Sequence, residues 1–136
     1  MRSINRILQL ALLPLLSACA APVTGPLEVS AWGGEGVSLS VTADGGQLEF
    51  DCATGAVPTR ILLDSGDFSL VGTVTLEHGG PVREGEPPDV HPASFDGSVA
   101  GKHMKLTVAI HDPLIEYEPT QYELVKGAPP MLRKCL

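Results

Sequence analysis

Apolar and polar residues alternate with a period of two through most of the chain after residue 26, a pattern typical of β-strands with one buried face. The clearest runs lie at 37–43, 47–52, 68–77 and 104–111. In the first run, for example, Val37, Leu39 and Val41 alternate with Ser38 and Ser40. No helical stripe of similar length is found in residues 27–136. We therefore predict one all-β domain over residues 27–136.

Short turn sequences separate these runs, and each contains the Gly or Asp that tight hairpins favour. They are Asp44-Gly45-Gly46, Asp64-Ser65-Gly66-Asp67 and Ala100-Gly101-Lys102. Short connections join neighbouring strands in antiparallel fashion, so we expect a meander of about seven or eight strands that closes into a small barrel or folds into a sandwich. We favour the barrel, because residues 94–108 resemble the hairpins of small lipocalin-like meander barrels. This is a resemblance of architecture and implies no function.

Residues 1–18 have the three zones of a bacterial secretory signal. Arg2 and Arg6 precede an apolar stretch at 7–16, which is too short to span a membrane, since a spanning helix needs about 20 apolar residues. The run Leu16-Ser17-Ala18-Cys19 then resembles the lipobox of bacterial lipoproteins. The resemblance implies cleavage before Cys19 and attachment of acyl chains to that cysteine. Two or three chains form a stable membrane anchor, because each buried methylene contributes about 0.8 kcal/mol.

The lipobox resemblance also predicts where the protein is located and how the chain is organised. Ala20 follows the lipidated cysteine, and by the sorting rule of enteric bacteria a residue other than Asp at this place implies the outer membrane, facing the periplasm. We therefore expect a signal peptide at 1–18, a lipidated N-terminus and tether at 19–26, and the β domain at 27–136. The tether is small and rich in Pro and Gly, as flexible connections are.

The charge of the chain excludes one class of partner. The formal net charge is −7, and removing Arg2 and Arg6 with the signal peptide leaves 7 basic against 16 acidic residues, or −9. Such a domain repels phosphate groups, so we expect no nucleic-acid binding. The hydrophobic content of 43% is sufficient for a globular core, but aromatic residues make up only 4%, so Val, Leu and Ile must form most of it.

Two cysteines remain once Cys19 carries lipid. An even pair in an exported protein usually forms a disulfide, so we predict a bridge between Cys52 and Cys135. It would fasten the C-terminal tail to a core strand. The alternative is a zinc-binding or catalytic thiol, but the sequence has no CxxC or HxxxH spacing to support it.

One long connection, at 78–92, interrupts the meander. Four prolines and three glycines lead us to expect neither strand nor helix there. Loops of this length in compact domains are often functional, so we take His78, Arg83, Glu84 and His91 as candidate ligand-contacting residues, with the solvated rigid connector as the alternative. Trp32 is a fifth candidate, because it stands beside Gly33-Gly34 and either plugs the barrel end or stacks on a ligand.

No catalytic or cofactor motif is convincing. Asp64-Ser65-Gly66 resembles the motif of retropepsin-like aspartic proteases, but Asp67 stands where that family has a small residue, and a hairpin turn explains the run equally well. No metal site or cofactor is expected. We therefore predict a non-catalytic envelope lipoprotein that binds a protein or glycan partner or braces an assembly. A lipocalin-like carrier of a small ligand, or less favourably an enzyme using the 78–92 loop, is the alternative.

Overall fold

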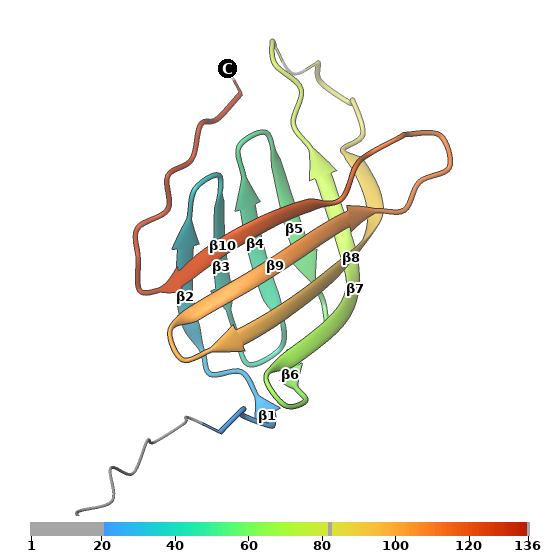
Figure 1. The fold of residues 1–136 in the computed structure, drawn as a ribbon. Coiled ribbons are helices and arrows are strands. Elements are labelled where there is room, and N and C mark those ends of the chain that lie inside the picture. Colours follow the sequence, from blue (N-terminus) through green and yellow to red (C-terminus); the bar gives the residue numbers. More distant parts are fainter. Residues whose placement is uncertain (1–20, 82, 136) are drawn as a thin grey trace, which may run out of the picture.

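The computed structural model describes residues 21–81 and 83–135, and eight strands of that part of the chain form a closed antiparallel barrel (Figure 1). The strands of the barrel are β2 (Ser30–Gly34), β3 (Val37–Val41), β4 (Gly46–Phe50), β5 (Ala53–Val57), β7 (Asp67–Leu76), β8 (Asp89–Ala100), β9 (His103–Ile110) and β10 (Thr120–Lys126). Around the barrel they follow the order β10-β2-β3-β4-β5-β7-β8-β9, and β9 pairs with β10 to close the ring. The predicted all-β fold is confirmed, as a barrel rather than a sandwich.

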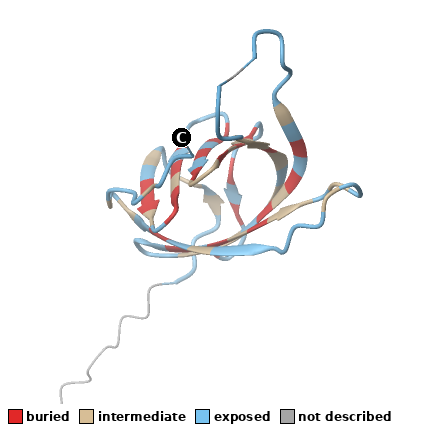
Figure 2. Cartoon of the chain, turned by 90° about the horizontal axis from the view of Figure 1, so that it is seen from above, coloured by how far each residue is buried: buried red, intermediate tan, exposed pale blue. Residues whose placement is uncertain are grey.

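The alternation in the sequence produces the core. On β3 and β4, Leu39 lies opposite Leu48 and Val37 lies opposite Phe50, and all four side chains point inward and are buried. The residues between them face solvent, because successive strand residues point to opposite faces of a sheet. Figure 2 shows buried positions recurring along the strands, whereas the connections are exposed. The middle of the barrel is therefore filled with side chains, chiefly Phe95, Met104, Leu106 and Leu124.

Two adjacent glycines permit the barrel to close. A Cβ atom on Gly34 would lie 2.1 Å from the carbonyl oxygen of Glu123, and one on Gly33 would lie 2.2 Å from that of Ala128. Neither position can hold a side chain without moving backbone, so β10 and the segment after it approach β2 only because both residues are glycine. The pair beside Trp32 is therefore a requirement of packing.

The N-terminal segment of the described chain packs against one end of the barrel, just before the first barrel strand begins. Gly25 and Pro26, the last residues of the expected tether, form β1 and pair with Leu63 and Leu62 of β6 (Leu62–Leu63). The amide of Gly66 donates to the carbonyl of Val23 at 2.8 Å. The predicted signal peptide, lipobox and Cys19 lie outside the described residues. Within residues 21–81 and 83–135, no helix is long and apolar enough to cross a membrane.

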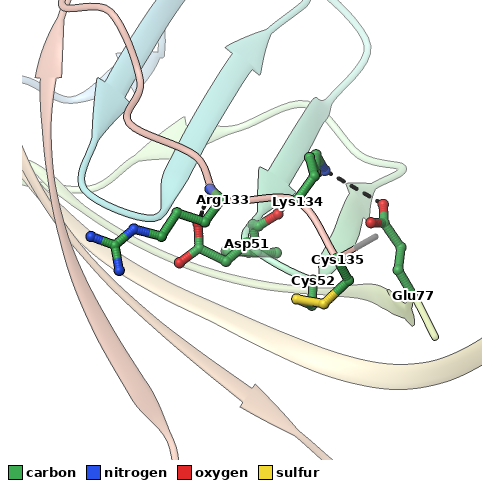
Figure 3. Close-up of a disulfide and its surroundings, with 7 residues drawn as sticks. Asp51, Cys52, Glu77, Arg133, Lys134 and Cys135 are labelled. Carbon is green, nitrogen blue, oxygen red and sulfur yellow. Dashed lines mark hydrogen bonds and ion pairs between the residues drawn. A yellow bond between two sulfur atoms is a disulfide. The ribbon is translucent and has the colours of Figure 1, made fainter. Parts of the chain in front are cut away.

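The segment after β10 runs back along β2 to the opposite end of the barrel (Figure 1). It is held midway by Met131, whose carbonyl accepts from the amide of Gly36 at 2.8 Å and whose amide donates to Gly34 at 3.1 Å. It ends in the disulfide between Cys135 and Cys52, with Cα atoms 5.2 Å apart (Figure 3). The predicted bridge is therefore present. We call residues 127–135 the C-terminal strap.

The prediction for residues 78–92 is wrong at its C-terminal end. Asp89 to Pro92 belong to β8, and Pro92 lies opposite Thr73 of β7. The carbonyl of Pro92 accepts a hydrogen bond from the amide of His111, on the side of β8 that faces β9. The nitrogen and carbonyl of a strand residue point to the same side, so the proline nitrogen points away from β7 and the β7–β8 pairing loses no hydrogen-bond donor. The irregular part of this connection is residues 77–88, which we call the 77–88 loop.

The disulfide should contribute strongly to stability. Replacing Cys52 and Cys135 together by Ser should lower the free energy of unfolding by about 4 kcal/mol, because the bridge restricts an 83-residue loop in the unfolded chain. Denaturant titration of wild type and variant measures the difference. Dithiothreitol is the matched control, since it should weaken only the wild type. Equal stability of the two proteins under oxidising conditions would contradict the prediction.

Candidate functional site

The end of the barrel opposite the N-terminal segment carries the two longest connections, and we call it the mouth. The 77–88 loop joins β7 to β8 there, and residues 111–119 join β9 to β10 (Figure 1). The turn between β4 and β5, with Asp51 and Cys52, lies at the same end, as does the end of the C-terminal strap. The mouth is therefore the place where irregular backbone and the chain's disulfide meet.

A cavity of about 220 Å³ lies inside the mouth. Its apolar wall is made by inward-facing residues of β4, β5, β7 and β9, namely Phe50, Ala53, Val74, Leu76, Val108 and Ile110. The remaining lining residues are Asp51, Cys52, Tyr117, Glu118, Thr120 and Tyr122. The rings of Phe50 and Tyr122 are 5.2 Å apart between centroids and tilted by 35°, so they form one aromatic corner. Every wall except the 111–119 connection and the β4–β5 turn is regular sheet, which makes the cavity a preformed one.

Beside this cavity a buried histidine lies between two aspartates. His91 Nδ1 is 2.7 Å from Asp112 Oδ2, and His91 Nε2 is 2.6 Å from Asp89 Oδ1. The contact with Asp89 is an ion pair whose angle does not suit a hydrogen bond. Asp89 Oδ2 is in turn 2.7 Å from Nε2 of the exposed His78. We call these four residues the His91 cluster. His91 is only 5% exposed, because it shares the inward face of β8 with Ala93 and Phe95.

The electrostatics of the cluster favour a charged imidazole. The hydrogen bond to Asp112 and the proximity of Asp89 raise the pKa of His91 above its usual value of 6.5, although desolvation opposes them. The pKa of Asp89 is lowered, first by its hydrogen bond with His78 and further by His91. The pKa of Asp112 is lowered by the backbone amide of Leu114 and then by His91. A protonated His91 thus carries its charge between two carboxylates, as buried charges require.

The His91 cluster fastens both long connections at their bases. Asp89 opens β8 at the end of the 77–88 loop, and Asp112 is the second residue of the connection from β9 to β10. Asp112 also accepts from the amide of Leu114 at 2.9 Å, which fixes the first turn of that connection. The same connection supplies Tyr117 and Glu118 to the cavity. The cluster therefore positions one wall of the cavity without lining it.

The structure brings together only some of the residues singled out from the sequence. His78 and His91 meet through Asp89, whereas Arg83 and Glu84 are exposed on the 77–88 loop and do not line the cavity. Trp32 is buried on β2, where its indole N–H donates to Ser30 Oγ at 2.9 Å. It borders a second hollow, of about 710 Å³, at the barrel end where the N-terminal segment packs. Within the described residues, no group of three or more His, Cys, Asp or Glu could hold a metal ion.

Sequence reasoning missed Asp112, Tyr117 and Tyr122 as site residues, and it did not single out Asp89, which lies in the 78–92 segment that it favoured. A signal existed for the two aspartates, because Asp89 and His91 are two apart, as are Ile110 and Asp112, and residues two apart on a strand share a face. For Asp89 it was overlooked because the prolines and glycines of residues 78–92 argued against a strand. The two tyrosines carry no comparable signal, since their place in the wall depends on how β10 closes the barrel.

The His91 cluster predicts a pH-dependent stability. Because the pKa of His91 is raised, its contribution is complete below pH 6.5 and is lost as the pH rises through the higher folded-state pKa. Because the pKa values of Asp89 and Asp112 are lowered, their contribution is present above pH 3.8 and is lost as the pH falls. We expect the cluster to stabilise the fold most between these two pH values.

Melting temperatures across this range, with NMR titration of the histidine ring protons, measure the effect. His91→Asn should lower the melting temperature. It should also remove the decline in melting temperature above pH 6.5 that the raised pKa of His91 produces. His103→Asn, at an exposed position before the inward-facing Met104, is the matched control and should leave the decline in place. A His91 pKa at or below 6.5 by NMR would refute this account of the cluster.

Comparisons with known proteins give no relative from which a function could be transferred. The chain matches no protein-family model, no curated protein and no solved structure. The function is therefore argued from the geometry of the mouth.

Proposed function

We propose that the chain is a non-catalytic lipoprotein of the cell envelope whose barrel binds a small apolar molecule in the mouth cavity. The observation that carries the proposal is the cavity itself, a mainly apolar space of about 220 Å³ that is open at the mouth and bounded by the inner faces of four strands and an aromatic corner. Preformed apolar cavities with a few polar groups at the edge are the usual form of small-molecule sites. This makes ligand binding the better supported role, ahead of bracing an assembly.

The size of the cavity sets the size of the ligand. An engineered apolar cavity of about 150 Å³ admits benzene, whereas drug-sized ligands need about 300 Å³ or more. A space of about 220 Å³ fits one ring or a short branched chain. The barrel is packed below the cavity by Phe95, Met104 and Leu106, which leaves no room for the long hydrophobic ligands of a wide lipocalin-like barrel. If the protein is a lipocalin-like carrier, the geometry therefore favours a compact ligand.

The polar groups near the mouth favour binding over catalysis. His91 is held between two carboxylates and so presents no free basic nitrogen to the cavity. Ser94 Oγ and His111 Nε2 are 2.8 Å apart, but Ser94 points outward on β8, because its neighbours Ala93 and Phe95 point inward. A nucleophile on the outer face of the barrel has no enclosed site beside it. The serine and histidine are better explained as a cross-strand hydrogen bond.

The envelope location is supported by Leu16-Ser17-Ala18-Cys19 and by the disulfide, which persists in oxidising compartments. The described chain begins at the end of the barrel opposite the mouth (Figure 1). A barrel anchored through Cys19 would thus hold its cavity away from the membrane surface, open to periplasmic solutes or partners.

Lipid attachment is tested by metabolic labelling with a clickable fatty acid in a bacterial host. The wild-type chain should incorporate the label, and Cys19→Ser should abolish it, because the lipobox cysteine is the acceptor. Cys52→Ser with Cys135→Ser is the matched control and should keep the label. Equal labelling of wild type and Cys19→Ser would refute the lipoprotein assignment.

Ligand binding is tested by filling the cavity. NMR titration of the exported, oxidised protein with single-ring compounds should shift the methyl signals of Val74, Val108 and Ile110, which line the cavity. Ala53→Leu places a larger side chain in the same space and should weaken binding by at least about tenfold, equivalent to 1.4 kcal/mol. Ala43→Leu, at an exposed position in the β3–β4 turn, should bind as wild type does. Undiminished binding by a folded Ala53→Leu variant, or no binding by the wild type, would overturn the proposal.

A further inference from the structure

From the charges around the mouth cavity we infer that it selects small apolar molecules that carry a positive charge, namely compact organic amines or ammonium compounds. The inference rests on the proposed function and names the chemical class of its ligand. Two carboxylates and three aromatic rings line the space, and no Lys or Arg is among the lining residues. An apolar body with a cationic group fits this combination better than a neutral or anionic molecule of the same shape.

Asp51 is the first of the two carboxylates, and its place is fixed from outside the cavity. Its Oδ1 accepts from the backbone amide of Arg133 on the C-terminal strap at 2.7 Å. The neighbouring Lys134 extends toward Glu77, with Nζ 3.4 Å from Glu77 Oε1 (Figure 3). The strap thus orients Asp51 through an uncharged donor, and its lysine pairs with Glu77 and also donates to the carbonyl of Phe50 at 3.3 Å. Within the described residues no lysine or arginine forms an ion pair with Asp51 itself, so its negative charge still acts on the cavity.

The charge of Asp51 already affects a residue of the cavity wall. The pKa of Tyr122 is raised above its usual value of 10.0, chiefly by burial and further by the negative charge of Asp51. Burial of this ring and repulsion by Asp51 both disfavour a tyrosinate. The same field would disfavour an anionic ligand in that position and favour a cationic one.

Glu118 is the second carboxylate and comes from a different element. It lies on the 111–119 connection beside Tyr117, across the cavity from the β4–β5 turn that holds Asp51. The faces of Phe50, Tyr117 and Tyr122 carry negative quadrupole potential and so attract a cation within the apolar wall. A ligand ammonium group near the opening would meet carboxylate charge and aromatic faces, while its hydrocarbon part contacts Val74, Leu76 and Val108.

The surroundings of the cavity strengthen this preference. Among the described residues, the turns, loops and strap end at the mouth hold eight acidic residues, of which Asp112 is paired with His91, against three basic ones, Arg83, Arg133 and Lys134. The acidic residues are Glu35, Asp51, Glu77, Glu84, Glu86, Asp112, Glu116 and Glu118. Their summed potential concentrates cations near the opening over distances of about 10 Å at ordinary ionic strength. Attraction of this kind weakens as salt is added.

Three probes with one aromatic ring and different charges test the inference, namely benzylamine, benzyl alcohol and benzoate. Their dissociation constants for the exported, oxidised protein are measured at neutral pH from the methyl shifts of Val74, Val108 and Ile110. Benzylamine should bind at least about tenfold more tightly than benzyl alcohol, and benzoate should bind most weakly. Added salt should reduce the advantage of benzylamine and leave benzyl alcohol unchanged.

Charge-neutral variants assign the effect to the two carboxylates. Glu118→Gln and Asp51→Asn should each bring benzylamine closer to benzyl alcohol, and the Asp51→Asn variant keeps a side-chain oxygen for the amide of Arg133. Asp44→Asn, at an exposed position in the β3–β4 turn at the other end of the barrel, is the matched control and should behave as wild type. Equal binding of all three probes would overturn the charge selection and leave the proposed function standing. Binding of none would overturn both, and a benzylamine advantage that survives in both folded variants would overturn the role of these carboxylates.

Discussion

The contact between β10 and β2 is the constraint on which the rest of the molecule depends. Only two residue pairs join these strands, Val125 with Gly33 and Lys126 with Trp32, whereas six pairs join β10 to β9. The absence of side chains at Gly33 and Gly34 lets the backbones approach. Closure covers the single apolar face of the sheet and removes its open edges. The strap then reinforces the barrel seam that has the fewest residue pairs, because Met131 bonds to Gly34 at the end of β2 and to Gly36 just after it, and Cys135 is joined to the turn between β4 and β5.

Closure also creates the cavity. Phe50 belongs to β4 and Tyr122 to β10, and their rings come within 5.2 Å only when the sheet has curled on itself. In an open sheet the same apolar residues would lie on an exposed face and enclose nothing. The His91 cluster acts on the other side of the mouth, where the ion pair between His91 and Asp112 holds the start of the 111–119 connection against β8. Covalent, packing and electrostatic interactions therefore define different walls of one space.

Much of the fold could be predicted from the sequence because its strongest strands have one buried face. Val37, Leu39 and Val41 predict β3 without further information, since alternation over a half-buried sheet is a local property. The β10 strand carries a weaker signal, because its inward Tyr122 and Leu124 are followed by an exposed Val125. Asp89 and His91 were assigned to a loop because of the prolines and glycines of residues 78–92, which include Pro92. Whether a strand tolerates a proline depends on which neighbouring strand the proline nitrogen faces.

The site was less predictable than the fold for a physical reason. The cluster needs His91 of β8 beside Asp112, which lies just beyond β9, and that alignment follows from a register set by the whole β8–β9 pairing. Cys52 and Cys135 could be paired because only two cysteines remained after Cys19 was assigned. The cavity is what remains after the interior has been filled, so it depends on the volumes of many side chains together. Composition indicated a core of aliphatic residues but not where that core would stop.

The strap also determines the order in which an exported chain can complete its fold. A chain that crosses a membrane from its N-terminus delivers Cys52 well before Cys135, which lies 83 positions later. β10, the strand that closes the barrel, follows all the other strands in the sequence. The first seven barrel strands therefore emerge with an unpaired thiol and an open sheet edge, a state prone to wrong disulfides and intermolecular strand pairing. If the chain is exported as proposed, folding of this domain is completed only after translocation has delivered the strap, and chaperones and thiol oxidants of the receiving compartment would act on a nearly full-length, unclosed chain.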